Sequence, residues 1–425
     1  MKTILLIGAG KSAAVLIDYL VQGATQQQWH LIIADASKAT ILDKINHSTA
    51  AEAIALDITD AASRSATISR ADIVISLLPP ALHFLAAKDC IQLQKHLLTA
   101  SYLDDNMKSL KQEIENRQLL FLCEMGLDPG IDHMSAMQLV DGIKKKGGKI
   151  TSFKSHCGGL VAPENDDNPW HYKISWNPRN VVLAGKAGAE YKWQNKIIHT
   201  TYAELFSSCT EVIAEGLGTL AYYPNRNSLG YMPLYGLEDA ATFIRTTLRH
   251  PAYCKGWNAI VQAGLTDDTV LIDASGLTYS QWAAPVAAYI QPGNKEMLHY
   301  LGLMDDTPVP ARAKTSADIL QHLLETRLQM QPNDKDMIVM LHEIEYSIDG
   351  KNKKMKSSLV VKGEDSLRTA MAKTVGLPLG IAAKCIIDGT IMLRGLQVPV
   401  LKEIYDPVLQ DLARQGIVFN EHGTA

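Results

Sequence analysis

The sequence predicts an α/β protein, with a doubly wound parallel sheet at its N-terminus and a mixed α/β domain after it. Three observations support this fold class. Apolar strands alternate with helical segments over about the first 125 residues, a glycine-rich turn follows the first strand, and from about residue 149 several strands follow one another without helices between them. We expect a helical subdomain to be inserted in the second domain.

Composition excludes several classes of partner. The chain has 425 residues, 47% of them apolar and 20% charged, and a formal net charge of -4. This balance implies no basic surface, so we expect no nucleic-acid partner. No apolar run approaches the roughly 18 residues of a membrane-spanning helix, so we expect no membrane partner. The six cysteines are far apart and form no C-x-x-C motif, which predicts thiols in a reducing compartment, the cytoplasm.

The segment KTILLIGAGKSAAVLIDYLVQ predicts a buried strand, a G-x-G-x-x-A turn and an amphipathic helix. Gly8 would make the tight turn, Gly10 would let the backbone approach a pyrophosphate, and Ala13 would let the helix pack close to its strand. Lys11 and Ser12 would open the helix, whose first N–H groups face the phosphates. We therefore expect a Rossmann-type dinucleotide-binding domain. The alternative is a doubly wound domain that binds no dinucleotide.

Five further strands are predicted at HLIIADA, EAIALDI, ADIVISLLPP, HLLTAS and LLFLCEMG. Asp35 ends the first of these, where a carboxylate can accept hydrogen bonds from the adenosine ribose and repels a 2′-phosphate, which favours NAD over NADP. Lys38 is close enough to weaken that preference, and Asp35 could instead cap the next helix. Asp57 ends the following strand beside the expected adenine. Leu78 ends the next strand, where the nicotinamide half would pass.

The stretch GLDPGIDHMSAMQLV, residues 126–140, predicts a turn followed by a helix. Asp128 lies in that turn, beyond the carboxyl end of a strand, where ligands of α/β proteins bind. The alternative is an Asp that only forms the turn or caps the helix. The predicted domains are a dinucleotide-binding domain at 1–128, a substrate-binding domain at 129–385 with a helical insertion at about 240–332, and a return to the first domain at 386–425.

Strands of a mixed or antiparallel sheet are predicted at KITSFKSHCGG, NVVLAGK, EYKWQNKIIHT, TEVIAEGLGTLAYYP, DMIVMLHEIEYSIDG and KMKSSLVVKG. The last two are joined by SIDGKN, a hairpin signal. A helical stretch begins at LEDAATFIRTTLRHPAYCKGWNAIVQAGL. A final apolar helix at LRTAMAKTVGLPLGIAAKCIIDGTI is expected to pack back on the first domain and to close a cleft between the domains.

Residues 155–180, SHCGGLVAPENDDNPWHYKISWNPRN, crowd polar groups between glycines and prolines. A zinc hydrolase built here would need ligands from His156, Cys157, Glu164 and His171. These residues show no H-E-x-x-H spacing and lie among turn formers, so we expect no metal. The other interpretation is a loop that meets a polar substrate and a cofactor and then returns as a strand at YKISW.

In order along nearly the whole chain, the motifs TASY, GLDPGIDH, CGGLVAPENDDNPWHYKISWNPRN, YPNR, TLR and AMAKTVGLP…DGTI…RG resemble those of the L-glutamate-forming saccharopine dehydrogenases, also called saccharopine reductases. The resemblance implies a dinucleotide domain, a mixed α/β domain that also forms a homodimer, and a small helical domain. It also implies a reaction of lysine metabolism, the oxidation of saccharopine with water to glutamate and 2-aminoadipate 6-semialdehyde, or the reverse condensation.

Saccharopine is a secondary amine with three carboxylates, so its site needs cations, a slot for nicotinamide and a proton acceptor. Arg226 of YPNR and Arg249 of TLR offer bidentate forks for carboxylates. Asp128 is the first candidate for the base and Tyr102 the second, with water as an intermediary. By resemblance, other residues line the site: Ser101, Tyr102, Asp128, Thr247 and Leu248 on the substrate, Leu127, Pro129 and Ser175 on the cofactor, and Cys157 near the reacting centre.

One departure from the resemblance concerns the cofactor. Members that use NADP carry an Arg directly after the second strand, whereas this chain has ADAS, with Asp35 at that place. We therefore expect NAD, with NADP as the alternative. Two other functions stay open. One is a dehydrogenase of another carboxylated secondary amine, such as carboxynorspermidine, and the other is a non-catalytic protein that senses a dinucleotide.

Overall fold

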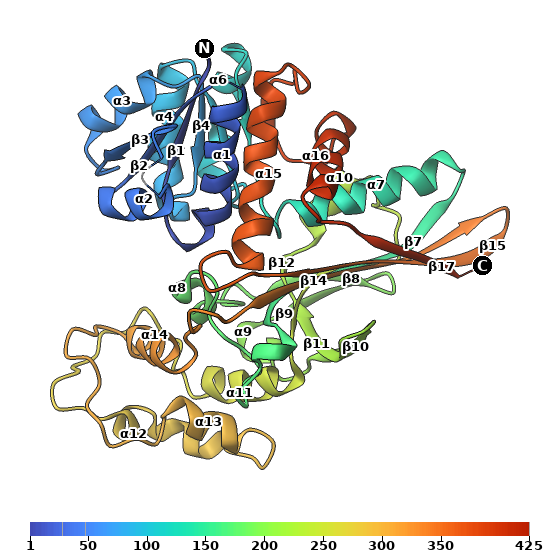
Figure 1. Ribbon diagram of the computed structural model, residues 1–425. Coiled ribbons are helices and arrows are strands. Elements are labelled where there is room, and N and C mark those ends of the chain that lie inside the picture. Colours follow the sequence, from blue (N-terminus) through green and yellow to red (C-terminus); the bar gives the residue numbers. More distant parts are fainter. Residues whose placement is uncertain (28, 47, 425) are drawn as a thin grey trace. The chain divides into compact units, whose positions relative to one another are not determined.

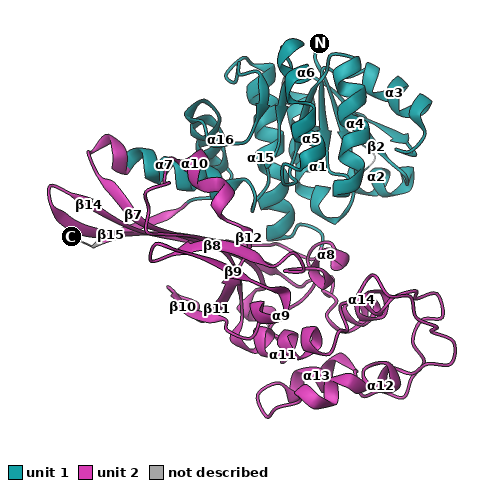
Figure 2. Cartoon of the chain, turned by 180° about the vertical axis from the view of Figure 1, so that it is seen from behind, with its two compact units in different colours: residues 1–142, 367–418 teal, residues 143–366, 419–425 magenta. Residues whose placement is uncertain are grey.

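The computed structural model describes residues 1–27, 29–46 and 48–424. The chain forms two compact units, which Figure 2 colours separately. Unit 1 comprises residues 1–142 and 367–418, and unit 2 comprises residues 143–366 and 419–425. Unit 1 contains a parallel sheet and unit 2 a mixed sheet with helices, so the predicted fold class is confirmed.

The parallel sheet of unit 1 has the strand order β16-β6-β5-β4-β1-β2-β3. Figure 1 labels its strands β1 to β4. The chain runs outward from β1 in one direction and then from β4 in the other, as in a doubly wound Rossmann-type fold. The six strands predicted in this region are all present. The strands are β1 Thr3–Ile7, β2 His30–Asp35, β3 Ala51–Ala55, β4 Ile73–Ser76, β5 His96–Thr99, β6 Leu120–Leu122 and β16 Gly395–Gln397.

Helices connect these strands, so the carboxyl ends of the strands meet at one edge of the sheet. The residues predicted to bind the cofactor from β1 to β4 all follow or end a strand at this edge. The helices of unit 1 are α1 Ala14–Gln27, α2 Lys38–Lys44, α3 Ala61–Ser69, α4 Pro80–Gln92, α5 Asp105–Ser109, α6 Lys111–Asn116, α7 Ile131–Lys145, α15 Ala370–Ile387 and α16 Lys402–Arg414.

Helix α15 packs against α1 within unit 1 (Figure 1). Gly376 and Gly380 permit this close approach, because a Cβ atom would lie 2.8 Å from Leu16 Cβ at the first position and 2.7 Å from Tyr19 Cδ1 at the second. By length and composition α15 could cross a membrane, but 67% of it is buried inside the protein. Helix α15 therefore belongs to the core of unit 1.

The units divide at other residues than the predicted domain limits of 128/129 and 385/386. The first division falls inside α7, after residue 142, and the second precedes α15, after residue 366. Packing explains both differences. The hydroxyl of Tyr405 donates to Asp141 Oδ2 at 2.6 Å, which ties α7 to α16 in unit 1, and the two glycines of α15 seat that helix on α1.

Unit 2 contains a mixed sheet in the order β10-β11-β13-β7-β14-β15-β17, with β8, β9 and β12 beside this path. Strand β7 pairs parallel with β13 and antiparallel with β14. The β14–β15 hairpin turns at Asp349 and Gly350, both with positive φ, as SIDGKN predicts. The strands are β7 Lys149–Val161, β8 Ala189–Trp193, β9 Lys196–Thr200, β10 Thr210–Ala214, β11 Gly218–Pro224, β12 Arg226–Asn227, β13 Thr242–Arg249, β14 Asp336–Ile348, β15 Lys351–Lys362 and β17 Asn420–Thr424.

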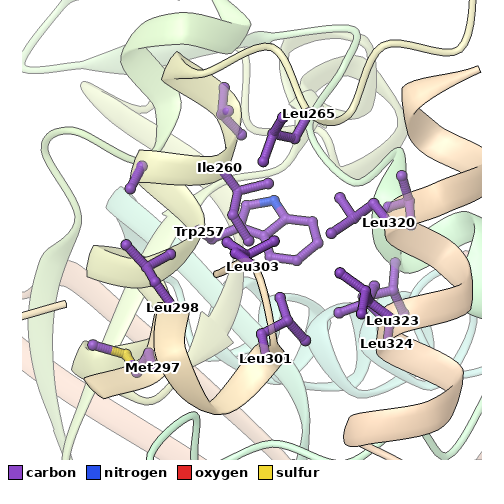
Figure 3. Close-up of a cluster of buried hydrophobic side chains, with 14 of the residues drawn as sticks. Trp257, Ile260, Leu265, Met297, Leu298, Leu301, Leu303, Leu320, Leu323 and Leu324 are labelled. Carbon is purple, nitrogen blue, oxygen red and sulfur yellow. The ribbon is translucent and has the colours of Figure 1, made fainter. Parts of the chain in front are cut away.

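A helical layer of unit 2 packs around Trp257, which is fully buried among apolar side chains such as Ile260, Leu301 and Leu323 (Figure 3). The helical insertion at about 240–332 stays a prediction, although residues 251–262 and 316–327 of this layer are helical. The helices of unit 2 are α8 Pro178–Val182, α9 Tyr202–Leu205, α10 Met232–Tyr235, α11 Pro251–Gln262, α12 Tyr279–Trp282, α13 Lys295–Leu301 and α14 Ser316–Arg327.

Three local predictions in unit 2 are wrong. TFIRTTLR, inside the predicted helical stretch, is strand β13, because it pairs with β7 and β11 far away in sequence. The stretch NVVLAGK lies mostly in helix α8 and the turn after it, because Asn177 caps that helix and Pro178 opens it. YKISW is not a strand, since Ile174 forms only an isolated bridge to Gln329.

We expect Gly158→Ala to destabilise unit 2. A Cβ there would lie 2.4 Å from the carbonyl oxygen of Leu248 on β13, so either backbone must shift, which costs about 1–3 kcal/mol of unfolding free energy. Denaturant unfolding monitored by circular dichroism measures the change. Gly423→Ala on β17 is the matched control, because no described atom lies within 4 Å of its Cβ position. Equal stability of the two variants would contradict this packing argument.

Candidate functional site

The glycine-rich turn of unit 1 is packed tightly toward the sheet and is open on its other side. Gly8 has a φ of +104°, and a Cβ there would lie 2.9 Å from the carbonyl oxygen of Leu77 after β4. Among the described residues, nothing lies within 4 Å of the Cβ position of Gly10. The turn can therefore form only with glycine at position 8, and it leaves room for a pyrophosphate at position 10.

Asp35 connects this turn to the end of β2. Its Oδ2 accepts a hydrogen bond from Ala9 N at 2.7 Å, and its Oδ1 accepts one from Ser37 N at 3.0 Å. The side chain that caps α2 belongs to Ser37, so Asp35 is not the cap of that helix. Each carboxylate oxygen has a further lone pair, so Asp35 can still accept a hydrogen bond from a ribose hydroxyl.

Lys44, the last residue of α2, also reaches the turn, a contact that no local sequence pattern predicts. Its Nζ donates to the carbonyl oxygens of Ala9 and Gly10. Burial lowers the pKa of Lys44, and the nearby Asp35 carboxylate opposes that shift. A cation and an anion thus lie together where the adenosine ribose of a dinucleotide would bind.

The other residues predicted to bind the cofactor lie at the same edge of the sheet. Lys11, Ser12 and Ala13 form a 3-10 turn that leads into α1, with Ala13 N donating to the carbonyl of Gly10. Asp57 is exposed, and the pKa of its carboxyl is lowered by hydrogen bonds from the hydroxyl and N–H of Thr59. Leu78 is half-buried just beyond β4.

The two candidate bases, Tyr102 and Asp128, form one hydrogen-bonded pair. The Tyr102 hydroxyl donates to Asp128 Oδ1 at 2.8 Å. Tyr102 follows β5 and Asp128 follows β6, the neighbouring strand of the sheet. Leu127 is buried, and the peptide bond between Asp128 and Pro129 is cis. The pair can therefore pass a proton between a phenol and a carboxylate at the edge where the cofactor residues lie.

Buried polar groups hold the chain on both sides of this pair. Glu124 Oε1 accepts a hydrogen bond from Leu103 N at 2.9 Å, directly after Tyr102. Glu124 Oε2 lies 2.8 Å from His133 Nε2, in the first turn of α7. Asp132 Oδ1 accepts a hydrogen bond from Gly130 N at 2.7 Å and so closes the turn that contains Asp128. These contacts fix the backbone at residues 102–103 and 128–130.

Arg249 is a buried cation at the end of β13 in unit 2. It is only 4% exposed, and its guanidinium lies over the rings of Tyr172 and Tyr253 at 5.3 and 5.4 Å. Burial raises the pKa of both phenols, so they stay neutral and supply no countercharge. Within the described residues, the Arg249 Nε has no hydrogen-bond partner, and no carboxylate forms an ion pair with the guanidinium. The guanidinium can therefore receive an anion from a ligand.

Thr247 and Cys157 lie on the same face of the sheet as Arg249. Residues two apart on a strand share a face, and the β7–β13 register pairs Thr247 directly with Cys157. Cys157 is a buried thiol. Leu248 points to the other face, into an apolar cluster with Tyr222 and Val339. Of the three residues 247–249, Leu248 therefore contributes its side chain to the core and could meet a ligand only through its backbone.

The fold of unit 2 does not bring Arg226 next to Arg249. Arg226, with a φ of +52°, is exposed on β12, directly after Asn225, whose N–H donates to the carbonyl of Arg245. In the antiparallel pairing of β11 with β13, Arg249 lies opposite Ala221, at the end that is farther from Arg226. Ser175 is buried between Ile174 and Trp176, which pack on the helical core.

The stretch 155–180 uses its polar groups within the protein. His156 Nδ1 bonds to Thr246 Oγ1 at 2.7 Å, His171 pairs with Asp166, and Glu164 pairs with Lys362. Among the described residues, no group of three or more His, Cys, Asp or Glu side chains could hold a metal ion. The loop is pinned through Lys173, whose Nζ lies 2.8 Å from both Asp167 and Asp334.

Sequence reasoning missed several functional neighbours. Tyr172 belongs to the polar stretch, but its ring serves the Arg249 site. Arg245 lies on the same face of β13 as Arg249, is buried, and stacks over the ring of Tyr231 at 4.4 Å. The alternation in FIRTTLR, with arginines four residues apart, would have placed both on one face if the segment had been taken as a strand. His83, which contacts Ser101, had no such signal.

Comparison with known proteins agrees with these two units. Residues 4–122 match the family model described as the saccharopine dehydrogenase NADP binding domain, and residues 126–417 match the saccharopine dehydrogenase C-terminal domain. The chain belongs to the saccharopine dehydrogenase family. The glycine-rich turn of unit 1 thus lies in the part matched by the model described as NADP binding, and the buried Arg249 lies in the part matched by the C-terminal model.

Individual relatives cover the whole chain. The saccharopine dehydrogenase [NADP(+), L-glutamate-forming] of Saccharomyces cerevisiae is 32% identical over the full length of both chains. The solved structure of the apo histidine-tagged saccharopine dehydrogenase (L-Glu forming) from that yeast superposes with a TM-score of 0.89, at 31% identity and complete coverage of both chains. The mitochondrial alpha-aminoadipic semialdehyde synthase of Mus musculus is 33% identical, and the chain spans about half (48%) of its length.

We expect Arg249→Met to leave the unfolding free energy unchanged or to raise it, because replacing an uncompensated buried cation with an apolar side chain removes a desolvation cost. The matched control is Arg64→Met in unit 1, where Arg64 Nε binds Asp89 Oδ2 at 2.8 Å and both residues are buried. That change leaves a buried carboxylate alone and should cost about 3–5 kcal/mol. Denaturant unfolding measures both variants. A loss of unfolding free energy of similar size in Arg249→Met would show that Arg249 stabilises the fold rather than awaiting a ligand.

Proposed function

We propose that this protein catalyses the NAD-dependent oxidation of saccharopine with water to L-glutamate and 2-aminoadipate 6-semialdehyde, or the reverse reductive condensation, in lysine metabolism. The named activity of the yeast relative, which the chain matches over its full length, supports this reaction. The chemistry of both units is compatible with it, since unit 1 has a dinucleotide turn and a proton-accepting pair, and unit 2 has a buried cation for a carboxylate.

The observation that carries the proposal is the buried charge of Arg249. Taking a guanidinium out of water costs several kcal/mol unless an anion compensates it. Within the described chain no carboxylate does so, and two neutral tyrosine rings offset only part of the cost by cation–π attraction. A tricarboxylate substrate such as saccharopine supplies the missing anion, with the bidentate geometry that guanidinium prefers.

Proton transfer falls to Tyr102 and Asp128. A nicotinamide bound in unit 1 would supply the hydride acceptor for the carbon beside the amine nitrogen of the substrate. The Tyr102–Asp128 pair takes up the amine proton, directly or through a water molecule, and the Asp128 charge stabilises the positive charge that develops on the substrate nitrogen. Water then adds to the imine carbon, and the C–N bond breaks to release the amine of glutamate and the aldehyde.

The choice of NAD rests on Asp35. Its carboxylate ends β2, where it can bind the two ribose hydroxyls of NAD and repels the 2′-phosphate of NADP. Lys44 offsets part of that charge, and the three fungal relatives are named for NADP(+). The local anion nevertheless favours NAD in this chain, because the residue that ends β2 is the Asp35 carboxylate rather than a cation.

The direct test is formation of reduced nicotinamide by the purified protein with saccharopine, using NAD and NADP in parallel. We expect turnover with one glutamate released per NADH formed, and a higher kcat/KM for NAD than for NADP. Carboxynorspermidine, with fewer carboxylates, should react poorly. No turnover of saccharopine with either cofactor would reject the proposed function, whereas a preference for NADP would reject only the choice of cofactor.

Removing the charge of Asp35 should shift the cofactor preference. In Asp35→Asn one oxygen can still accept the Ala9 N–H bond, but the repulsion of a 2′-phosphate is gone. We expect the ratio of kcat/KM for NADP to that for NAD to rise at least about tenfold, which corresponds to about 1.4 kcal/mol. Asp43→Asn on the exposed side of α2 removes the same charge and is the control. An equal shift in both variants would indicate a general charge effect.

A homodimer and a cytoplasmic location are further proposals. The homodimer is supported by the edge strand β10, where Ile213 is 74% exposed and the strand's outer hydrogen-bonding groups face away from β11. The location is supported by the six cysteines, all of which are thiols rather than disulfides.

A further inference from the structure

A chain of hydrogen bonds runs from the inside of unit 1 to Ser101. Ser76 Oγ lies 2.8 Å from His83 Nδ1, and His83 Nε2 lies 2.8 Å from Ser101 Oγ. Ser76 ends β4 and is fully buried, His83 lies in the first turn of α4 and is buried, and Ser101 follows β5 and is half-buried. The neighbouring strands β4 and β5 hold the two serines on either side of the imidazole.

Burial keeps the imidazole in this chain neutral. It lowers the pKa of His83 from 6.5 to about 4, although the nearby Asp104 carboxylate opposes the shift. A neutral imidazole has one N–H donor and one acceptor nitrogen, so only two arrangements of hydrogens fit the two contacts. Either Nδ1 donates to Ser76 and Nε2 accepts from Ser101, or Nδ1 accepts from Ser76 and Nε2 donates to Ser101.

The surroundings of Ser76 select the second arrangement. Within the described residues, the Ser76 side chain has no hydrogen-bond partner except His83 Nδ1. If Nδ1 donated to Ser76, the Ser76 hydroxyl hydrogen would be buried without an acceptor, which is costly. If Ser76 donates to Nδ1, its hydrogen is used, Nε2 carries the ring proton, and Nε2 donates to Ser101 Oγ. The Ser101 hydroxyl then has its own hydrogen left for another acceptor.

We propose that Ser76 and His83 are positioning residues that fix Ser101 as a hydrogen-bond donor toward a carboxylate of the substrate. Every hydrogen in the chain Ser76–His83–Ser101 points outward, from the buried serine to the half-buried one. A serine hydroxyl alone can donate or accept in any direction, but here one of its two lone pairs takes the imidazole N–H, which directs the hydroxyl hydrogen away from His83. The role of Ser101 toward a substrate rests on the proposed function, whereas the direction of the hydrogen bonds rests on the geometry of unit 1 alone.

Such a polarised chain discriminates between ligand groups. A carboxylate oxygen accepts the Ser101 hydrogen in a charge-assisted bond. An ammonium or other pure donor can use only the remaining lone pair of Ser101, and it leaves the directed hydroxyl hydrogen without an acceptor, so it binds less well. The hydrogen bonds from Ser76 to Ser101 therefore add a preference for the anionic groups of the substrate without adding charge to unit 1.

The direction of the hydrogen bonds from Ser76 through His83 to Ser101 can be measured without any substrate. Nitrogen-15 chemical shifts distinguish a protonated ring nitrogen from an unprotonated one, and the signals of His83 are assigned by their loss in His83→Gln. We expect Nε2 of His83 to be protonated and Nδ1 to be unprotonated at pH 7 to 8 in the full-length protein. A protonated Nδ1 would overturn the proposal, and this result would stand whether or not saccharopine is turned over.

The effect on the substrate is tested by a double-mutant cycle. Ser101→Ala should raise KM for saccharopine at least about tenfold, with little change in KM for the cofactor. His83→Leu, which removes the donor to Ser101, should raise KM several-fold, and His83→Gln, whose amide can still donate there, should restore most of the loss. In the Ser101→Ala background the change His83→Leu should have no further effect on KM, because the hydroxyl that it orients is absent.

Additive effects of the two substitutions on KM would overturn the proposal, as would equal KM values for His83→Leu and His83→Gln. Thermal unfolding of each variant separates loss of fold from loss of orientation, because a merely structural role would lower stability without the coupling to Ser101. If wild-type protein does not oxidise saccharopine at all, the proposed function fails, and the ring-nitrogen measurement alone decides the direction of the chain.

Discussion

The desolvation of Arg249 is the constraint that the surrounding residues of unit 2 must offset. A buried cation must be surrounded by groups that offset its lost hydration. Tyr172 and Tyr253 provide ring faces, and Leu248 provides a carbonyl that accepts a hydrogen bond from the guanidinium at 2.8 Å. The polar loop supplies Tyr172 and helix α11 supplies Tyr253, and their two ring centroids lie 5.1 Å apart. The ion pairs of Lys173 then hold that loop in place.

Unit 1 solves a different problem, the orientation of neutral and acidic groups at the ends of parallel strands. Strand ends leave polar backbone groups at one edge of the sheet, and side chains there must be fixed by neighbours from other strands. Asp35 binds the turn after β1, and His83 links the ends of β4 and β5. Tyr102, which follows β5, binds Asp128, which follows the neighbouring strand β6. These contacts orient each group before any ligand binds, which reduces the cost of ordering it on binding.

Local motifs were predicted well and long-range partners were not. The turn at Gly8 and Gly10 could be predicted because strand, turn and helix are contiguous, and the required backbone conformation is specific to glycine. Lys44, Glu124 and His83 could not, because each contacts a group that is distant in sequence or lies on another strand, and each is an ordinary residue of its own helix or loop. The β13 segment was misassigned for the same reason, since its pairing partners β7 and β11 come from other parts of the chain.

The sequence by itself determined the doubly wound sheet, the glycine turn and the chemical types of the site residues, because periodicity and turn chemistry act over a few neighbouring residues. The tertiary structure decided which of those residues acquire a function. Within the described residues, burial leaves Arg249 without a carboxylate partner, and Leu248 packs in the core. The buried Ser76 directs the hydrogen bonds of His83 toward Ser101. These properties depend on what surrounds a side chain in three dimensions, and strand pairing over long sequence distances sets those surroundings.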